Sequence, residues 1–324
     1  MITSVLLFAV GLVLLIKGGD WFVDGATGIA KRFNLPDIVV GATVVSIGTT
    51  LPEVMVSTTG ALAGSGAMAY GNAIGSIICN TALIAAISIT CNPGPVNVKS
   101  MKTPAIFFFC SAALYCFASY VLGEFPRWLG FVMLSVFVVY MVLTVRNGMA
   151  NPDTAEEEEE EASKPKALWQ ELLLLVIGAA VIAVGADLLV EHGQIIALGL
   201  GVPETVVALL FVALGTSLPE LVTTITSLKK GRASLGVGNV IGANVFNLVL
   251  VSGVAVTLAP FDVPVENTLL NTGLNLSLVF DIPVMLLVMS LMIFPALIHK
   301  KLDRRQGIAL LAIYAAFVVC QFVL

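Results

Sequence analysis

Gly48-Thr49-Thr50-Leu51-Pro52-Glu53 recurs 167 residues later as Gly215-Thr216-Ser217-Leu218-Pro219-Glu220, and each copy lies inside an apolar stretch long enough to cross a bilayer. The same offset relates other residues along the chain: Asp20 to Asp187, Pro36 to Pro203, Gly71-Asn72 to Gly238-Asn239 and Asn80 to Asn247. The chain is therefore a duplicated unit with one carboxylate in each motif. Because an ionisable group inside a membrane is costly to keep, the two glutamates mark a functional site.

Composition independently places the chain in the membrane. Hydrophobic residues make up 58% of the chain and charged residues 11%, with a mean hydropathy of +1.01, values far from those of a soluble domain. We predict an integral membrane protein with ten apolar spans, each close to the roughly 20 residues that a helix needs to cross the hydrocarbon core. They cover residues 2–29, 38–62, 70–90, 104–122, 127–146, 169–196, 205–228, 235–258, 274–298 and 306–323.

The number of spans sets the relation between the halves. Five spans per half is an odd number, so the second half is turned upside down relative to the first, as in many secondary transporters. We predict a first five-helix repeat at 1–146, a linker at 147–167 and an inverted second repeat at 168–324. The linker contains six consecutive glutamates, 156–161, which repel one another and favour a solvated acidic segment over a calcium sensor. It is too short to build a folded regulatory domain.

The distribution of basic residues predicts the orientation. Of the 16 Lys and Arg residues, 14 fall in alternate connections, and only Arg127 lies in the opposite ones. By the positive-inside rule the linker is cytoplasmic and both termini face outward. We expect an integral protein of a prokaryotic inner (plasma) membrane. The 14 residues are Lys31, Arg32, Lys99, Lys102, Arg146, Lys164, Lys166, Lys229, Lys230, Arg232, Lys300, Lys301, Arg304 and Arg305.

Each motif places a proline directly before its glutamate, near the middle of a span. Pro52 has no amide proton and its ring crowds the preceding turn, so the carbonyl of Gly48 loses its helical partner. Irregular backbone at that depth is tolerated only where it lines a cavity or is buried in protein. We therefore expect broken helices that gather freed carbonyls, hydroxyls and a carboxylate, an all-oxygen set suited to Ca²⁺ and Na⁺.

Spans 70–90 and 235–258 add polar residues at a spacing of four, which places them on one helix face. The first carries Asn72, Ser76 and Asn80. The second carries Asn239, Ala243 and Asn247. These side chains can complete a cation shell without adding charge. Glycines at 71, 75, 238 and 242 form small-xxx-small pairs that packing alone would explain, but packing does not explain two polar stripes.

Together, the paired G-T-[ST]-L-P-E and G-N-x-I-G-[SA]-x-x-x-N segments resemble the two repeat motifs of the sodium/calcium exchanger family, within the calcium/cation antiporter superfamily. The resemblance covers nearly the whole chain and is to the prokaryotic type, which lacks a regulatory domain. It implies an all-α membrane protein in which discontinuous helices 2, 3, 7 and 8 surround a central cation site. It also implies that Ca²⁺ and Na⁺ share Glu53 and Glu220. Further oxygens would come from Thr49, Thr50, Ser76, Asn80, Thr216, Ser217 and Asn247, and from the backbone of Ser46 and Ala213.

Two departures from the family pattern matter. Ala243 stands where Ser76 does in the first half and where relatives often carry serine, which puts one sodium ligand in doubt. Asn247 stands where potassium-dependent relatives usually carry aspartate, which favours potassium independence. The glutamate that follows the Gly-Asn pair in cation/proton exchangers is absent, because the chain reads Gly71-Asn72-Ala73.

The sequence thus predicts an antiporter that exchanges Ca²⁺ for Na⁺ by alternating access. The alternatives are a Ca²⁺/H⁺ or other divalent-cation antiporter on the same scaffold and, with less support, a cation channel. An enzyme is not expected, since no Ser/His, Asp/Asp or His/Glu metal pairing is present. The expected partners are Ca²⁺, Na⁺, competing H⁺ and the lipid bilayer, with no nucleic acid, no cofactor besides the transported ions and no requirement for oligomers.

Overall fold

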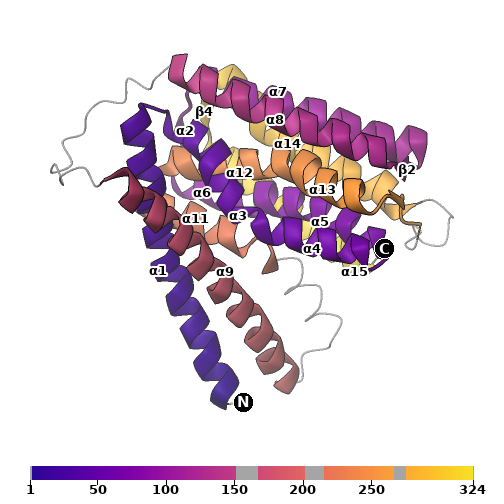
Figure 1. Cartoon of the computed structure of the whole chain (residues 1–324), viewed down its shortest axis with the longest axis horizontal. Helices are drawn as coiled ribbons and strands as arrows, with labels where there is room; N and C mark the ends of the chain where they lie inside the picture. The colour runs from indigo at the N-terminus through magenta and orange to yellow at the C-terminus, as the bar shows by residue number, and fades with distance from the viewer. Residues whose placement is uncertain (1, 151–166, 201–214, 266–274, 324) are drawn as a thin grey trace.

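The computed structural model describes residues 2–150, 167–200, 215–265 and 275–323, and the chain within these ranges is almost entirely helical (Figure 1). Short two-residue strands are the other regular elements. Within these residues seven helices are long and apolar enough to cross a membrane, or eight if a bent pair counts as one span. They are α1 (Ile2–Phe33), Gly66–Cys91, Val98–Leu122, α8 (Arg127–Ala150), α9 (Leu168–Gly199), Ala233–Leu258 and Ser277–His299, with Asp37–Thr49 and Leu51–Leu62 as the bent pair.

Several of these spans are built from successive α- and π-helical pieces. The bent pair contains α2 (Asp37–Val40), the π-helical η1 (Gly41–Val45), α3 (Ser46–Thr49) and α4 (Leu51–Leu62). The remaining pieces of the first half are α5 (Gly66–Cys79), η2 (Asn80–Ala85), α6 (Ala86–Cys91), α7 (Val98–Phe117) and η3 (Ala118–Leu122). Those of the second are α11 (Leu218–Lys229), α12 (Ala233–Phe246), η4 (Asn247–Val251), α13 (Ser252–Leu258), η6 (Ser277–Asp281), α14 (Ile282–His299) and α15 (Arg304–Val323).

The duplication in sequence is also a duplication in structure. Helices α4 and α11 begin and end 167 residues apart, and so do α5 and α12. In both halves the next turn is π-helical and begins at the asparagine of the repeat, Asn80 or Asn247. The same local sequence therefore builds the same local structure twice.

Helices α1 and α9 form a pair that extends away from the rest of the molecule (Figure 1). A β-carbon added to Gly11 would come within 2.9 Å of the carbonyl oxygen of Gly185, and one added to Gly25 within 2.6 Å of that of Glu171. These pairings run the two helices antiparallel with their backbones in direct contact. Near one end, Arg32 Nε donates to Glu171 Oε2 at 2.9 Å and ties the pair together.

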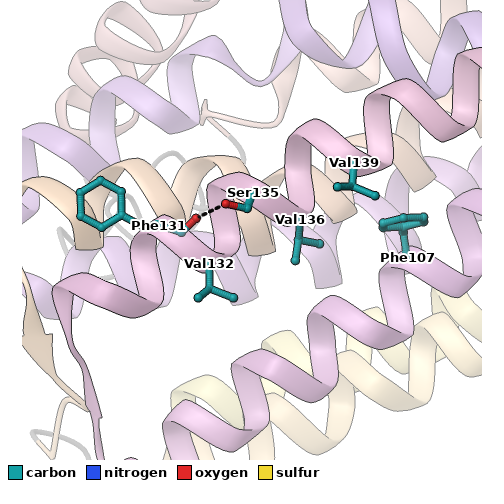
Figure 2. A pocket seen from close by; sticks show the side chains of 6 residues that line it. All are labelled: Phe107, Phe131, Val132, Ser135, Val136 and Val139. Atoms are coloured by element: carbon teal, nitrogen blue, oxygen red, sulfur yellow. Dashed lines mark hydrogen bonds between the residues drawn. The ribbon is translucent and has the colours of Figure 1, made fainter.

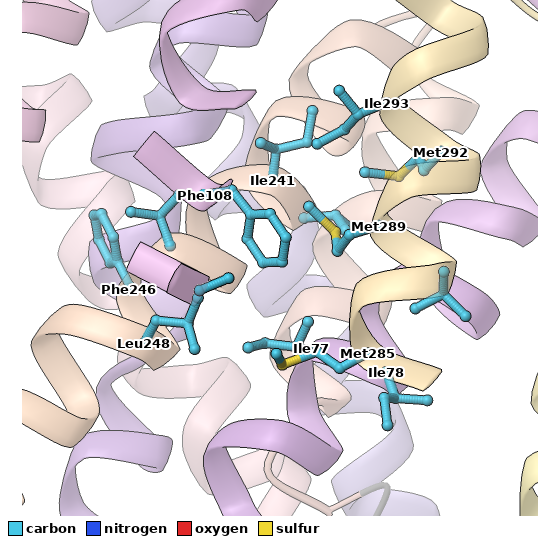
Figure 3. Close-up of a cluster of buried hydrophobic side chains, with 14 of the residues drawn as sticks. Ile77, Ile78, Phe108, Ile241, Phe246, Leu248, Met285, Met289, Met292 and Ile293 are labelled. Carbon is cyan, nitrogen blue, oxygen red and sulfur yellow. The ribbon is translucent and has the colours of Figure 1, made fainter. Parts of the chain in front are cut away.

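The remaining helices pack around a continuous apolar core. Figure 3 shows side chains from four helices meeting there: Ile77 from α5, Phe108 from α7, Ile241 from α12 and Met289 from α14. All four are fully buried. The α12–α13 helix is buried along most of its length, which places the second polar stripe inside the protein instead of against lipid.

Connections on the same side of the bundle pair with each other. Strand β1 (Gly94–Pro95) pairs antiparallel with β4 (Lys301–Leu302), and β2 (Glu124–Phe125) pairs with β3 (Phe261–Asp262). The first pair joins two of the lysine-rich connections. Two ion pairs hold the connection between α11 and α12: Lys230 Nζ lies 2.7 Å from Asp24 Oδ1 of α1, and Arg232 lies 3.2 Å from Asp37 at the start of α2.

Helices cover the expected spans where the structure describes them, but their bounds differ by several residues, as in 104–122 against Val98–Leu122, and α15 (Arg304–Val323) is not among the helices that are long and apolar enough to cross a membrane. Only residues 218–228 of the predicted span 205–228 can be compared, because 201–214 lie outside the described residues. In the segment predicted as the linker, α8 continues to Ala150 and α9 begins at Leu168; residues 151–166, which include the glutamate run, lie outside the described ranges.

Candidate functional site

The first motif interrupts its helix where the proline predicts a break. Helix α3 ends at Thr49, α4 begins at Leu51, and the axes on either side of Thr50 differ by 46°. Pro52 occupies the first turn of α4, where a missing amide proton costs no hydrogen bond. In the second half α11 likewise begins at Leu218, directly after Ser217, whose backbone angles (φ −88°, ψ 4°) match those of Thr50 (φ −86°, ψ 0°).

The two breaks place Glu53 and Glu220 in the first turns of α4 and α11. Both side chains are 0% exposed, and none of their four carboxylate oxygens has a hydrogen-bond partner among the described residues. The two lie close enough for their charges to interact. Within the same residues no ion pair includes either glutamate. Such groups are costly to bury unpaired, so the arrangement calls for a cation or a proton.

Other buried polar side chains of the two motifs and the two stripes also lack hydrogen-bond partners among the described residues. Glu220 lies beside the hydroxyls of Thr49 and Thr50, which come from the other half, without forming a hydrogen bond of standard geometry. All of the neutral groups are at most 1% exposed, and a shell of unpaired oxygens is what a dehydrated cation needs. The unpaired atoms belong to Thr50, Asn80, Ser217 and Asn247, all four of them predicted site residues.

Asn80 and Asn247 lie on helices that are not broken. The sequence predicts discontinuous helices here, but Gly66–Cys91 and Ala233–Leu258 each run through as one helix, so that prediction is wrong for helices 3 and 8. Each contains a π-helical turn that starts at the asparagine. No proline is present to break them, and a π turn alters local hydrogen bonding without ending the helix.

The other predicted residues form a second layer of hydrogen bonds that crosses between the halves. Thr49 Oγ1 donates to Asn239 Oδ1 at 3.1 Å, and its counterpart Thr216 Oγ1 donates to Asn72 Oδ1 at 3.3 Å. Asn72 and Asn239, which the polar stripes single out as possible cation ligands, therefore each tie one motif to the opposite half.

Ser46 and Ser76 also belong to this layer. Ser46 Oγ donates within its own helix to the Gly41 carbonyl at 2.9 Å, and it also contacts Asn239. Ser76 Oγ donates to Asn72 Oδ1 at 3.4 Å. Ser46 is fully buried and its carbonyl oxygen accepts a hydrogen bond from the Thr50 amide at 3.0 Å, whereas Ala213 lies outside the described residues.

The glycines of the second stripe explain how α12 reaches the site. A β-carbon on Gly238 would lie 2.2 Å from the carbonyl oxygen of Ile38, and one on Gly242 would lie 2.4 Å from Ser46 Oγ. Only glycine allows α12 to pack directly on α2 and η1. This contact brings Asn239 within reach of Thr49 and Ser46.

Oxygen atoms dominate the donor set of the candidate site. Among the described residues, no group of three or more His, Cys, Asp and Glu side chains is gathered closely enough to hold a metal ion. Two carboxylates with hydroxyl and amide oxygens favour hard cations. A groove on the outer surface between α7 and α8 offers no alternative site, since apolar side chains and Ser135, whose hydroxyl donates to the Phe131 carbonyl, line it (Figure 2).

Comparison with known proteins agrees with this chemistry. The family model described as sodium/calcium exchanger protein matches residues 3–146 and 171–323. The sodium/calcium exchanger MaX1 of Methanosarcina acetivorans is 28% identical over 98% of both chains. An uncharacterised membrane protein of Methanocaldococcus jannaschii is 34% identical over 95% of this chain and 94% of its own length.

Solved structures give the same result for the fold. The sodium-calcium exchanger NCX_Mj, soaked with Na⁺ and Sr²⁺, superposes with a TM-score of 0.78 at 31% identity, covering 98% of each chain. The match spans both copies of the motif and the helices that carry them. By sequence and by structure, this membrane protein belongs to the sodium/calcium exchanger family.

Proposed function

We propose that the chain is a secondary active antiporter that exchanges Ca²⁺ for Na⁺ without a requirement for K⁺. The observation that carries this proposal is the pair of fully buried carboxylates, Glu53 and Glu220, whose oxygens have no partner among the described residues. Two negative charges balance one Ca²⁺. The same two carboxylates can instead bind Na⁺ ions together with neutral oxygens. One dehydrated cavity cannot hold the Ca²⁺ and the Na⁺ ions at the same time. Mutually exclusive binding is the basis of antiport.

The proposed ligands follow from the site geometry and from the family. Thr50, Asn80, Ser217 and Asn247 would supply unpaired side-chain oxygens, and the remaining oxygens would come from Thr49, Thr216, Ser76 and the backbone of Ser46 and Ala213. Asn247 brings an amide in place of a third carboxylate. The lower negative charge supports potassium independence, because an additional K⁺ would lack a countercharge.

The proposed architecture has ten spans in two inverted repeats, with both termini outside a prokaryotic plasma membrane and a cytoplasmic linker. The antiparallel packing of α1 and α9, whose residues lie at corresponding places in the two halves, supports the inversion. Alternating access would come from movement of this pair across the core that holds the site. The inverted repeat supplies a complete site within one chain, so oligomers are not required.

Transport assays in proteoliposomes test the proposal. Purified protein is reconstituted into vesicles loaded with Na⁺, K⁺ or buffered protons, and uptake of external Ca²⁺ is followed. Uptake should require internal Na⁺ and should not change when K⁺ is added. Ca²⁺ uptake that ignores the Na⁺ gradient would disprove Na⁺ coupling, while uptake driven by a proton gradient would favour the Ca²⁺/H⁺ alternative.

Protons are expected to compete with both cations. A buried carboxylate without a partner or a bound cation is stabilised by taking up a proton. Uptake of Ca²⁺ by Na⁺-loaded vesicles should therefore be slower at about pH 5 than at about pH 8, with the half-saturating Ca²⁺ concentration rising as pH falls. Equal uptake at the two pH values would contradict proton competition.

Replacement of Ala243 tests the missing sodium ligand. Ala243 is fully buried on the stripe that carries Asn239 and Asn247, at the position equivalent to Ser76. Ala243→Ser should lower the half-saturating Na⁺ concentration by about threefold, since one added hydroxyl contributes on the order of 1 kcal/mol or less. The Ca²⁺ constant should change by less. Na⁺-dependent Ca²⁺ release from vesicles measures both constants, and an unchanged Na⁺ constant would show that the position does not contact Na⁺.

A further inference from the structure

A polar cluster lies inside the apolar core next to the cation site and is not explained by cation binding. Asn244 Nδ2 donates to Thr81 Oγ1 at 2.7 Å and lies 3.0 Å from the sulfur of Met289, and Thr81 Oγ1 also lies 3.0 Å from that sulfur. Asn244, Thr81 and Met289 are all 0% exposed. In Figure 3 Met289 lies among apolar side chains that include Ile77 and Ile241.

The cluster joins the two halves at residues adjacent to the site. Thr81 directly follows Asn80 in the π-helical turn η2, and Asn244 directly follows Ala243 in α12. The carboxamide of Asn80 has no hydrogen-bond partner among the described residues. The direction in which Asn80 points is therefore set by the backbone of its turn, and the Asn244–Thr81 hydrogen bond holds that turn against the opposite half.

The repeat shows that packing does not require these polar residues. At the offset of 167, Ile77 corresponds to Asn244 and Leu248 corresponds to Thr81, and both apolar side chains are also 0% exposed. The duplicated fold thus accepts aliphatic residues at both positions. An asparagine buried in an apolar core with its Oδ1 unpaired is costly, so its presence in one half calls for another explanation.

We propose that Asn244 is a positioning residue: through its hydrogen bond to Thr81 it fixes the π turn that presents Asn80 to the transported cation. Asn80 then binds the cation without first paying the entropy of ordering its turn. Because the link exists once in the two halves, it holds Asn80 and not Asn247. This inference rests on the proposed cation site, and it assigns to Asn244 no direct contact with the cation.

Two single substitutions test the inference. Thr81→Val removes the hydroxyl at nearly constant volume, and Asn244→Leu replaces the amide with an apolar side chain. Each should raise the half-saturating Ca²⁺ concentration of Na⁺-driven uptake by about fivefold to tenfold, the factor expected from one buried hydrogen bond, while the maximal rate stays within about twofold. Thr81→Ser, which keeps the hydroxyl, should retain the wild-type half-saturating Ca²⁺ concentration.

Matched controls separate positioning from stability. Ser111→Ala removes a different buried hydroxyl, on α7, which has no hydrogen-bond partner among the described residues. This variant should leave the half-saturating Ca²⁺ concentration unchanged. If Asn244 acts through Asn80, Asn244→Leu should add less than about twofold in an Asn80→Ala background, measured as Ca²⁺ binding to purified protein by calorimetry. An independent, additive effect there would overturn the inference.

The outcomes remain distinguishable if a variant fails. Should Asn244→Leu not fold, Thr81→Val decides, because it preserves the shape of the side chain. A wild-type Ca²⁺ constant in Thr81→Val overturns the positioning role while leaving the exchanger proposal intact. Absence of Na⁺-dependent Ca²⁺ uptake by the wild-type protein in the same vesicles would instead contradict the proposed function.

Discussion

Glu220→Ala should abolish Ca²⁺ uptake driven by internal Na⁺, with a fall of at least about 100-fold. The variant leaves a single carboxylate, Glu53, to balance a divalent cation in a cavity that water cannot screen. Breaking a buried charge pair costs about 3–5 kcal/mol, which corresponds to a factor of roughly 100 to several thousand in binding. Glu53→Ala should behave in the same way, because the two side chains are equally buried and equally unpaired.

Stability measurements distinguish a lost ligand from a lost fold. In cation-free detergent solution, Glu220→Gln should unfold at the same temperature as the wild type or higher, since it removes a buried charge without a partner. Added Ca²⁺ should raise the unfolding temperature of the wild type and not that of the variant. Glu124→Gln, on an exposed strand residue, serves as the control and should retain both transport and the Ca²⁺ effect. Wild-type transport by Glu220→Ala would remove the basis for the assigned site.

Gly238→Ala is expected to destabilise the folded protein by about 3 kcal/mol or more, the upper part of the range for overpacked cores. The new β-carbon would lie 2.2 Å from the backbone oxygen of Ile38, and backbone cannot move aside as a flexible side chain can. Gly41→Ala should have a similar effect from the facing helix, where a β-carbon would lie 2.2 Å from the Leu235 carbonyl oxygen. Thermal unfolding in detergent measures the loss.

Glycine content alone does not produce this effect. A β-carbon on Gly94 meets nothing within 4 Å among the described residues, so Gly94→Ala is a control that should unfold close to the wild-type temperature. Because α12 carries Asn239, separation of α12 from η1 should also weaken the Thr49–Asn239 hydrogen bond and reduce cation binding. Equal stability of the Gly238→Ala and Gly94→Ala proteins would mean that the two helices do not require this close contact.

The sequence was sufficient to predict those parts of the site that local chemistry determines. Pro52 has no amide proton and its ring crowds the preceding turn, so the bend at Thr50 and the placement of Glu53 in the following turn could be predicted from it. Two carboxylates at matching depth without a basic partner likewise follow from the repeat and from the positions of Lys and Arg.

Features that depend on contacts between the halves could not be predicted in this way. The π turns at Asn80 and Asn247 contain no proline or glycine that would mark them in the sequence. The spacing of apolar residues over so short a segment does not distinguish a π turn from an α-helical turn. The pairing of Thr49 with Asn239, and of Thr81 with Asn244, joins residues more than 160 positions apart. Which member of a polar stripe contacts a cation and which supports its neighbour is decided by that packing.

The backbone contact between α1 and α9 makes the two helices one mechanical element. Gly11, Gly18 and Gly25 recur every seven residues and face the backbone of α9 at Gly185, Gly178 and Glu171, so the two backbones touch at those points and leave no room for a lipid tail. With Arg32 and Glu171 joined near one end, a force applied to either helix is carried by both. The two helices should therefore move as one unit, and their border with the rest of the bundle includes α11, where Val222 and Thr226 face Gly19.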